Sequence, residues 1–160
     1  MDIRKKFIEN IGDLGKSIGL NKTVCQIYAL LYITPEPMSP IDMSRKLNAS
    51  KGNISINIKK LEEWRAVKKI KRKGYSRSLY TANDDLESIV FEKLKIGLAK
   101  RNRSLTKTIV EAKKSIKKSD KKLEKYYSDR ISKIENLLKQ LELFTNNIDT
   151  LRSFLKNNIP

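Results

Sequence analysis

Histidine is absent from this sequence of 160 residues, and cysteine occurs only once, at Cys25. The absence of an imidazole excludes nucleophilic triads and dyads that depend on histidine. A structural zinc site would also lack the four Cys or His ligands that it normally uses. A single cysteine cannot form an intramolecular disulfide, which favours a reducing compartment. We therefore expect a protein that is not an enzyme and that holds no metal or cofactor.

Long apolar segments are missing as well. No apolar run reaches the ~20 residues that a helix needs to cross a bilayer. The basic start of the chain is not followed by the continuous apolar segment that is typical of a signal peptide. We therefore expect a cytoplasmic protein without a membrane partner. Apolar residues make up 39% of the chain, a modest share that fits a helical protein sharing part of its core with a second copy.

Acidic residues are scarce relative to basic ones. The chain has 18 Asp and Glu against 35 Lys and Arg, which gives a formal net charge of +17. Such a surplus indicates a negatively charged partner, either a nucleic acid, a membrane surface or an acidic protein. The sharpest cluster is the segment 68–77, in which every charged residue is basic. A basic run of this kind is usually a solvated face, unless it lies beside an element that reads a ligand.

The first third of the chain has the pattern of two helices. Apolar residues at helical spacing predict one helix over 3–16, and Gly19 interrupts the pattern. Asn21 is a suitable cap for a second helix, which must end before Pro35 because proline cannot continue a helix.

The next segment predicts two helices joined by a tight turn. Ser39 and Pro40 form an N-cap and a first-turn proline, and Asn48 is a suitable left-handed stop. Ser50 then caps a further helix that extends from Lys51 to about Trp64. The stripe of this helix that we expect to be buried is Ile54, Ile58 and Leu61.

A basic hairpin follows the helix pair. The segments 67–71 and 78–81 flank Gly74 and have the composition of a two-stranded hairpin. The order helix, turn, helix, basic hairpin is that of a winged helix. In this motif the second helix lies in the major groove, the first braces the backbone, and the hairpin, or wing, reaches the adjacent phosphates or the minor groove.

The helix from Ser50 to Trp64 therefore carries the predicted reading surface. With the apolar stripe turned inward, Gly52 would let DNA approach the backbone closely, Asn53 could pair with adenine, and Ile56 could touch a thymine methyl group. An outward isoleucine is hard to explain on a helix that faces only solvent. The predicted DNA-binding residues are Ser39, Ser50, Lys51, Gly52, Asn53, Ser55, Ile56, Asn57, Lys59, Lys60, Lys71, Arg72, Lys73 and Arg77.

After residue 83 the chain becomes long, charged and helical. The only proline is the terminal Pro160 and the only glycine is Gly97. Apolar residues at steps of three and four predict a coiled-coil or bundle seam. This seam and the first helix give the predicted dimerisation residues: Phe7, Ile11, Tyr127, Ile131, Ile134, Leu138, Leu141, Ile148, Leu151 and Leu155. We expect a mostly α fold with a winged-helix domain at 1–83, whose first helix joins the dimer interface, and a helical dimerisation region at 84–160.

Residues 7–83 resemble the winged-helix domain of MarR-type transcriptional regulators, and most closely the GbsR branch. The resemblance is carried by the segments Ile27–Tyr32, Ser50–Ser55, Leu61–Trp64 and Lys73–Gly74. It implies a homodimeric transcriptional repressor whose dimer is built from terminal helices, and a small-molecule inducer. With one reading helix from each subunit, we expect such a dimer to bind a pseudo-palindromic operator in double-stranded DNA. The wing departs from the family pattern, because Gly74 is not followed by the usual acidic and basic pair.

Two alternative functions remain open. A net charge of +17 would suffice for a non-specific architectural or chromatin protein, and winged helices also serve as protein-interaction adaptors. An aromatic cage for a choline-like cation is a further hypothesis, with Tyr28, Tyr32, Trp64, Tyr80 and Phe91 as its walls. Core packing is the more common fate of such residues. Cys25 is either a redox sensor or, more commonly for a helical cysteine, a small buried hydrophobic residue.

Overall fold

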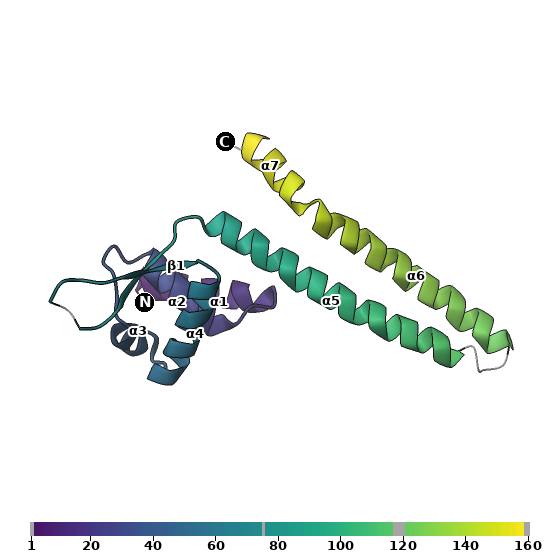
Figure 1. Ribbon diagram of the computed structural model, residues 1–160, viewed down its shortest axis with the longest axis horizontal. Helices are drawn as coiled ribbons and strands as arrows, with labels where there is room; N and C mark the ends of the chain where they lie inside the picture. The colour runs from purple at the N-terminus through teal and green to yellow at the C-terminus, as the bar shows by residue number, and fades with distance from the viewer. Residues whose placement is uncertain (1, 75, 117–120, 159–160) are drawn as a thin grey trace. The chain divides into compact units, whose positions relative to one another are not determined.

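A computed structural model describes residues 2–74, 76–116 and 121–158 of the chain. The chain divides into two compact units, Met1–Val90 and Phe91–Pro160 (Figure 1). The sequence placed the division after residue 83. The boundary lies later because Ile89 packs against the core of the first unit, so the start of the first long helix belongs to that unit.

The first unit begins with two helices, α1 (Ile3–Ser17) and α2 (Lys22–Tyr32). Asn21 caps α2, since its side-chain oxygen accepts a hydrogen bond from the Val24 N–H at 3.1 Å. The two helices approach closely at the glycines of α1. A Cβ added to Gly15 would lie 2.2 Å from the Sγ of Cys25, so the contact between α1 and α2 requires a residue without a side chain here.

A helix–turn–helix follows, formed by α3 (Pro40–Leu47) and α4 (Lys51–Glu63). The predicted start and stop signals are confirmed. The side chains of Ser39 and Ser50 cap the two helices, and Asn48 ends α3 in the left-handed conformation at φ 49°. The predicted stripe Ile54, Ile58 and Leu61 is buried. The turn between the helices therefore follows from local backbone chemistry that the sequence displays.

The strands β1 (Val67–Ile70) and β2 (Leu79–Ala82) pair antiparallel, which confirms the predicted hairpin. Val67 faces Ala82 and Ile70 faces Leu79 in the register. Met38, just before α3, adds an isolated bridge to this sheet through two backbone hydrogen bonds of 2.9 Å with Tyr80. The sheet is therefore tied to the helix–turn–helix at its base, while the loop between its strands extends away.

One hydrophobic core holds the first unit together. It is formed by α2, the inner faces of α3 and α4, and the inner side of the hairpin. The largest fully buried side chains are Ile27, Leu31, Met43, Ile54, Ile58, Leu61, Val24 and Ser39. The elements that carry the predicted DNA-binding residues therefore rest on a packed support.

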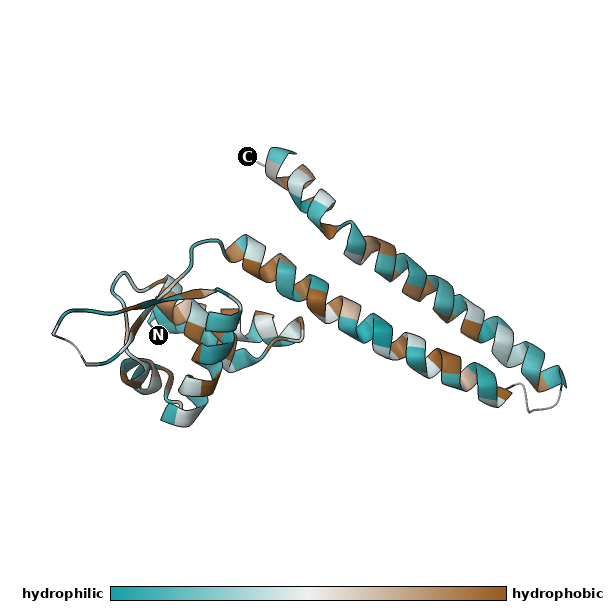
Figure 2. Ribbon diagram, viewed as in Figure 1, coloured by the Kyte–Doolittle hydropathy of each residue, from teal (hydrophilic) through white to brown (hydrophobic). Residues whose placement is uncertain are grey.

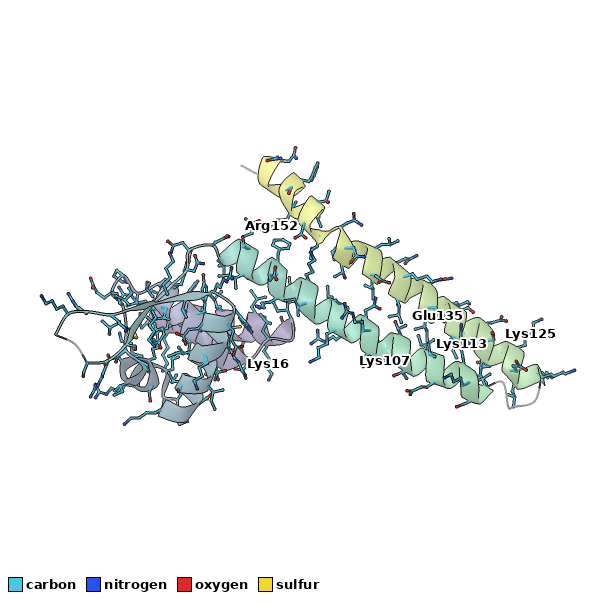
Figure 3. The ribbon with its side chains drawn as sticks, viewed as in Figure 1. Lys16, Lys107, Lys113, Lys125, Glu135 and Arg152 are labelled. Atoms are coloured by element: carbon cyan, nitrogen blue, oxygen red, sulfur yellow. The ribbon has the colours of Figure 1, made fainter. Side chains whose placement is uncertain are left out.

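The second unit contains the greater part of α5 (Leu86–Ile116), together with α6 (Lys121–Asn146) and α7 (Ile148–Asn158). The helices α5 and α6 run side by side in opposite directions (Figure 1). Lys113 and Glu135 point toward one another across this pair and form an ion pair at 2.7 Å (Figure 3). The Asn102 amide nitrogen also donates a hydrogen bond to the Leu138 carbonyl at 3.2 Å. Polar contacts thus connect the two long helices at these two levels.

Few apolar side chains are buried in the second unit. Among its described residues these are Ile109, Leu138 and Ile148. Hydrophobic and hydrophilic residues alternate along both long helices (Figure 2). The large apolar side chains that remain exposed on α6 and α7 are Leu123, Tyr126, Tyr127, Ile134, Leu137, Leu141, Leu143, Phe144, Leu151 and Phe154. No helix in the described part of the chain is long and apolar enough to cross a membrane.

The predicted dimerisation residues fall into two groups. The sequence assigned Leu138 and Ile148 to an interface with a second copy. The structure corrects this prediction, because both side chains are buried within the chain itself, at 6% and 3% exposure. The others are exposed or half-buried and remain available to a partner: Phe7, Ile11, Tyr127, Ile131, Ile134, Leu141, Leu151 and Leu155.

Candidate nucleic-acid interface

The outer face of α4 is open to solvent. With its apolar stripe packed on the core, the helix exposes Lys51, Gly52, Asn53, Ser55, Ile56, Lys59 and Lys60. Ile56 is 59% exposed, although isoleucine is a residue that folding normally buries. The cap residue Ser50 is also exposed and accepts a hydrogen bond from the Asn53 N–H at 3.2 Å. The face therefore combines polar, basic and apolar groups on one rigid element.

Gly52 has no packing role within the described part of the protein. A Cβ added there would have no atom within 4 Å among those considered. Glycine inside a helix costs about 0.5–1 kcal/mol relative to alanine. The fold itself thus gives no reason for a glycine in the first turn of α4, whereas a close approach of another molecule to the backbone does.

Two predicted contact residues are not accessible. Ser39 is 1% exposed, and its hydroxyl is engaged with Asp42 at the start of α3. Asn57 is 3% exposed, because it lies on the core side of α4 beside Ile58 rather than on a flank. The prediction that these two side chains contact DNA directly is therefore corrected: Ser39 is a cap and Asn57 is part of the helix–core interface.

Asn57 nevertheless forms hydrogen bonds with Asn53, a residue of the outer face. Its side-chain N–H group donates to the Asn53 carbonyl oxygen at 2.8 Å and to the Asn53 side-chain oxygen at 2.5 Å. Its own side-chain oxygen is buried without a hydrogen-bond partner in the described part of the chain. A buried acceptor left unpaired lowers the free energy of unfolding by about 1–3 kcal/mol. The side-chain oxygen of Asn57 therefore destabilises the fold at this position.

The wing supplies the second basic surface. Lys71, Arg72, Lys73 and Arg77 are all exposed, and none of them has an ion-pair partner among the residues that the structure describes. Gly74 turns the loop at φ 80°, a conformation that favours glycine. The wing therefore presents unpaired positive charges on a short protruding segment.

The sequence analysis left two basic residues of the same cluster out of the site. Lys68 and Lys69 are exposed on β1 and extend the charge of the wing toward its base. They belong to the segment 68–77, so the charge run itself contained the signal. The two adjacent lysines interrupt the alternation of the strand, so the sequence did not show which face of the hairpin each occupies.

Three of the five aromatic residues named as cage walls are engaged in the core of the first unit. Tyr28 is buried, stacks on Tyr32 with ring centroids 5.8 Å apart, and donates its hydroxyl to the Asn83 carbonyl at 2.6 Å. Burial, assisted by nearby Tyr32, raises the pKa of Tyr28 to about 12. Tyr80 is also buried, and Trp64 packs against the core. Tyr28, Trp64 and Tyr80 therefore support the fold of the first unit.

Cys25 lies at the contact between α2 and α1. Its sulfur occupies the space beside Gly15, and burial raises the pKa of the thiol. A raised pKa lowers the fraction of reactive thiolate at neutral pH. The environment of Cys25 is therefore that of a packing residue rather than that of an activated sensor.

Comparison with known proteins finds no matching family model and no matching curated protein. Among solved structures, the chain is similar to one described as a transcriptional regulator, with a TM-score of 0.64 and 15% identity over 97% of this chain and 99% of that chain. This similarity establishes the fold over nearly the whole length.

Two further solved structures are less similar. One is a mutant of MepR from S. aureus, with a TM-score of 0.41 and 12% identity over 84% of this chain and 89% of that chain. The other is the multiple antibiotic-resistance repressor (MarR) from Listeria monocytogenes, with a TM-score of 0.40 and 17% identity over 86% of this chain and 85% of that chain.

Proposed function

We propose that the protein is a sequence-specific, double-stranded DNA-binding transcriptional regulator of the MarR type, within the GbsR branch. The observation that carries this proposal is the outer face of α4, where Ile56 is 59% exposed beside a glycine that the fold does not need. A major groove would give both residues a function. It would cover the isoleucine with base edges and bring DNA against the helix backbone at Gly52.

The chemistry of the face matches the groove of a duplex. Ile56 would pack on a thymine methyl group, and Asn53 would hydrogen-bond to a base edge. Lys59, Lys60 and the basic residues of the wing would neutralise phosphates on either side, which fixes the position of the helix without reading sequence. The proposal thus assigns base recognition to α4 and most of the salt-dependent affinity to the wing.

We further propose that the regulator is a homodimer. The second unit exposes more large apolar side chains than it buries among its described residues, and such surfaces mark association sites. A two-fold dimer would place two copies of α4 on half-sites about one helical turn apart or a multiple of it. Repression would follow from blocking polymerase, and a small-molecule inducer would act by changing the separation of the two reading helices.

A competitor titration tests the proposal against the architectural alternative. Genomic fragments selected for binding should exceed random DNA in affinity by about 10³ or more at physiological salt. Asn53→Ala should reduce this ratio, whereas Lys71→Gln should weaken selected and random DNA alike and lower the salt dependence. Equal affinity for all sequences would favour an architectural protein. If the affinity for DNA does not fall steeply as the salt concentration rises, a protein-interaction adaptor would be favoured.

A further inference from the structure

We propose that Asn57 is a positioning residue for base recognition: it holds the side chain of Asn53 so that its amide nitrogen, a hydrogen-bond donor, faces the DNA. The inference rests on the proposed function, since it assigns a role within the same reading surface. It adds a residue that cannot touch DNA itself, and it predicts the kind of base edge that Asn53 selects.

The surroundings of Asn57 are those of a core position. It lies one residue from Ile58, three from Ile54 and four from Leu61, on the stripe of α4 that faces the hydrophobic core. A leucine of nearly the same shape would fill this space without a polar cost. The buried amide also leaves its own oxygen without a partner in the described part of the protein. Core packing alone therefore does not explain why an asparagine stands here.

The hydrogen bonds of Asn57 supply the explanation. Both of its donated bonds go to Asn53, one turn earlier: one to the backbone carbonyl and one to the side-chain oxygen at 2.5 Å. The bond to the carbonyl fixes the amide of Asn57, and the second bond then fixes the orientation of the Asn53 side chain. A surface asparagine that would otherwise sample several rotamers is held in one of them.

The hydrogen bond from Asn57 decides whether the Asn53 side chain offers DNA a donor or an acceptor. Asn53 is exposed, and its side-chain oxygen is occupied by the bond from Asn57. The group that it has left to offer a ligand is its amide nitrogen, for which the structure shows no hydrogen-bond partner among the described residues. A donor in the major groove selects acceptors, which are the N7 and O6 atoms of guanine, the N7 atom of adenine and the O4 atom of thymine. Cytosine offers a donor at its N4 group and is disfavoured.

The experiment compares base preference in variants of the full chain, by sequencing fragments selected from a randomised duplex pool. Asn57→Leu should reduce discrimination against cytosine at one operator position by about tenfold, while affinity for random DNA stays unchanged. Its melting temperature should stay the same or rise, since the unpaired buried oxygen is removed. Asn57→Ala is the second variant, in case leucine overfills the site, and should lose the same discrimination.

Asn102 provides a matched control. It is a second amide whose side-chain oxygen is buried without a partner in the described part of the chain, on α5, and Asn102→Leu should leave base preference unchanged. A further comparison isolates the coupling. In an Asn53→Ala background, Asn57→Leu should change base preference no further, because the residue acts only through Asn53.

Three results would overturn the inference. The first is unchanged base preference in both Asn57 variants while the unmodified protein remains sequence-specific. The second is an additional loss when Asn57→Leu is added to Asn53→Ala, which would indicate a general structural effect. The third is a preference for cytosine at the operator position whose base preference is lost in Asn53→Ala. If the unmodified protein shows no base preference at all, the proposed function fails first and this inference fails with it.

Discussion

The two units of the chain use the hydrophobic effect in different ways. The first unit buries its apolar residues in one core, and Ile27, Met43 and Ile54 are completely buried. The second unit buries Ile109, Leu138 and Ile148 among its described residues and leaves a larger set of apolar side chains on the surface. The first unit therefore has a core of its own, and the exposed apolar side chains of the second unit are the basis of the proposed homodimer.

The units also differ in the polar contacts that are prominent in each. In the first unit, Asn21, Ser39 and Ser50 cap α2, α3 and α4 with their side chains, and Asn48 ends α3. In the second unit, contacts between helices, such as the ion pair of Lys113 with Glu135, connect the long helices. Short helices with local caps thus support the proposed DNA-binding site, and long helices carry the proposed association surface.

The largest effect is expected from breaking the association surface of the second unit. Ile134 and Leu141 are 48% and 37% exposed and lie two turns apart on α6. Ile134→Glu combined with Leu141→Glu should convert a dimer to a monomer in analytical ultracentrifugation. Affinity for a two-half-site operator should fall by about 10²- to 10⁴-fold, since the second reading helix no longer binds from the same molecule.

Ser132→Glu combined with Gln140→Glu is the matched control for this variant. Both residues are exposed on the same helix, and the added charge is the same. This control should remain dimeric. If the Ile134 and Leu141 variant also remains dimeric, the exposed face of α6 is not the interface, and the contrast between the two units needs another explanation.

A second prediction sharpens the contrast in burial directly. Ile54 is fully buried, whereas Ile134 is half-exposed. Ile54→Ala should lower the free energy of unfolding by about 2–5 kcal/mol through lost contacts and a residual cavity. In dilute solution, where the chain is monomeric, Ile134→Ala should cost less than about 0.5 kcal/mol. Chemical denaturation measures both, and similar losses would contradict the assignment of a complete core to the first unit alone.

A third prediction concerns Tyr28, whose hydroxyl donates to the Asn83 carbonyl. Tyr28→Phe should cost about 1–2 kcal/mol at pH 8, because it removes a buried hydrogen bond. Burial raises the pKa of Tyr28 to about 12, above the value near 10 of an unfolded tyrosine. The unfolded chain therefore loses this proton first, so the stability that Tyr28 contributes is complete below about pH 10 and is lost as the pH rises through 12.

Denaturation midpoints between pH 8 and pH 12 test this expectation. The difference in free energy of unfolding between the natural protein and Tyr28→Phe should shrink across the upper part of this range. Tyr32→Phe is the control, since it removes the hydroxyl of the exposed ring that stacks on Tyr28. A constant difference for Tyr28→Phe at every pH would show that the two states bind this proton equally well.

The smallest effect is expected from replacing the helix glycines Gly52 and Gly97, and it distinguishes a role in folding from a role in DNA recognition. Gly52 in α4 and Gly97 in α5 both have open space where a Cβ would lie, with nothing within 4 Å among the atoms considered. Replacing either by alanine should raise the free energy of unfolding by about 0.5–1 kcal/mol, since alanine is the better helix former. Only Gly52→Ala should weaken DNA binding. Normal DNA binding by Gly52→Ala would contradict a close approach at the first turn of α4.

Local chemistry made much of the first unit predictable. The caps Ser39 and Ser50, the left-handed Asn48 and the stripe of α4 act within one or two turns, so the sequence displays them directly. The wing followed from its composition and from Gly74. The burial of Asn57 was not predicted, because an asparagine on a helix is expected to face water and only the packing of α4 shows that it does not.

The second unit was harder to interpret for a related reason. A repeating apolar pattern predicts a seam, but it does not say whether the seam is covered by the same chain or by a second copy. Leu138 and Ile148 carry the same signal as Ile134 and Leu141, yet the first two are buried within the chain and the others are exposed. The break between α6 and α7 at Asn147 was also missed, because no glycine or proline marks it.

The order of residues along the chain by itself determined the positions of the caps, the turn, the hairpin and the positive charge, since each depends on neighbours a few residues away. Only the folded arrangement decided which side of each helix faces water, which apolar residues satisfy one another within the chain, and that Asn57 serves Asn53 rather than a ligand. These outcomes depend on contacts between distant segments, and such contacts exist only once the core has formed.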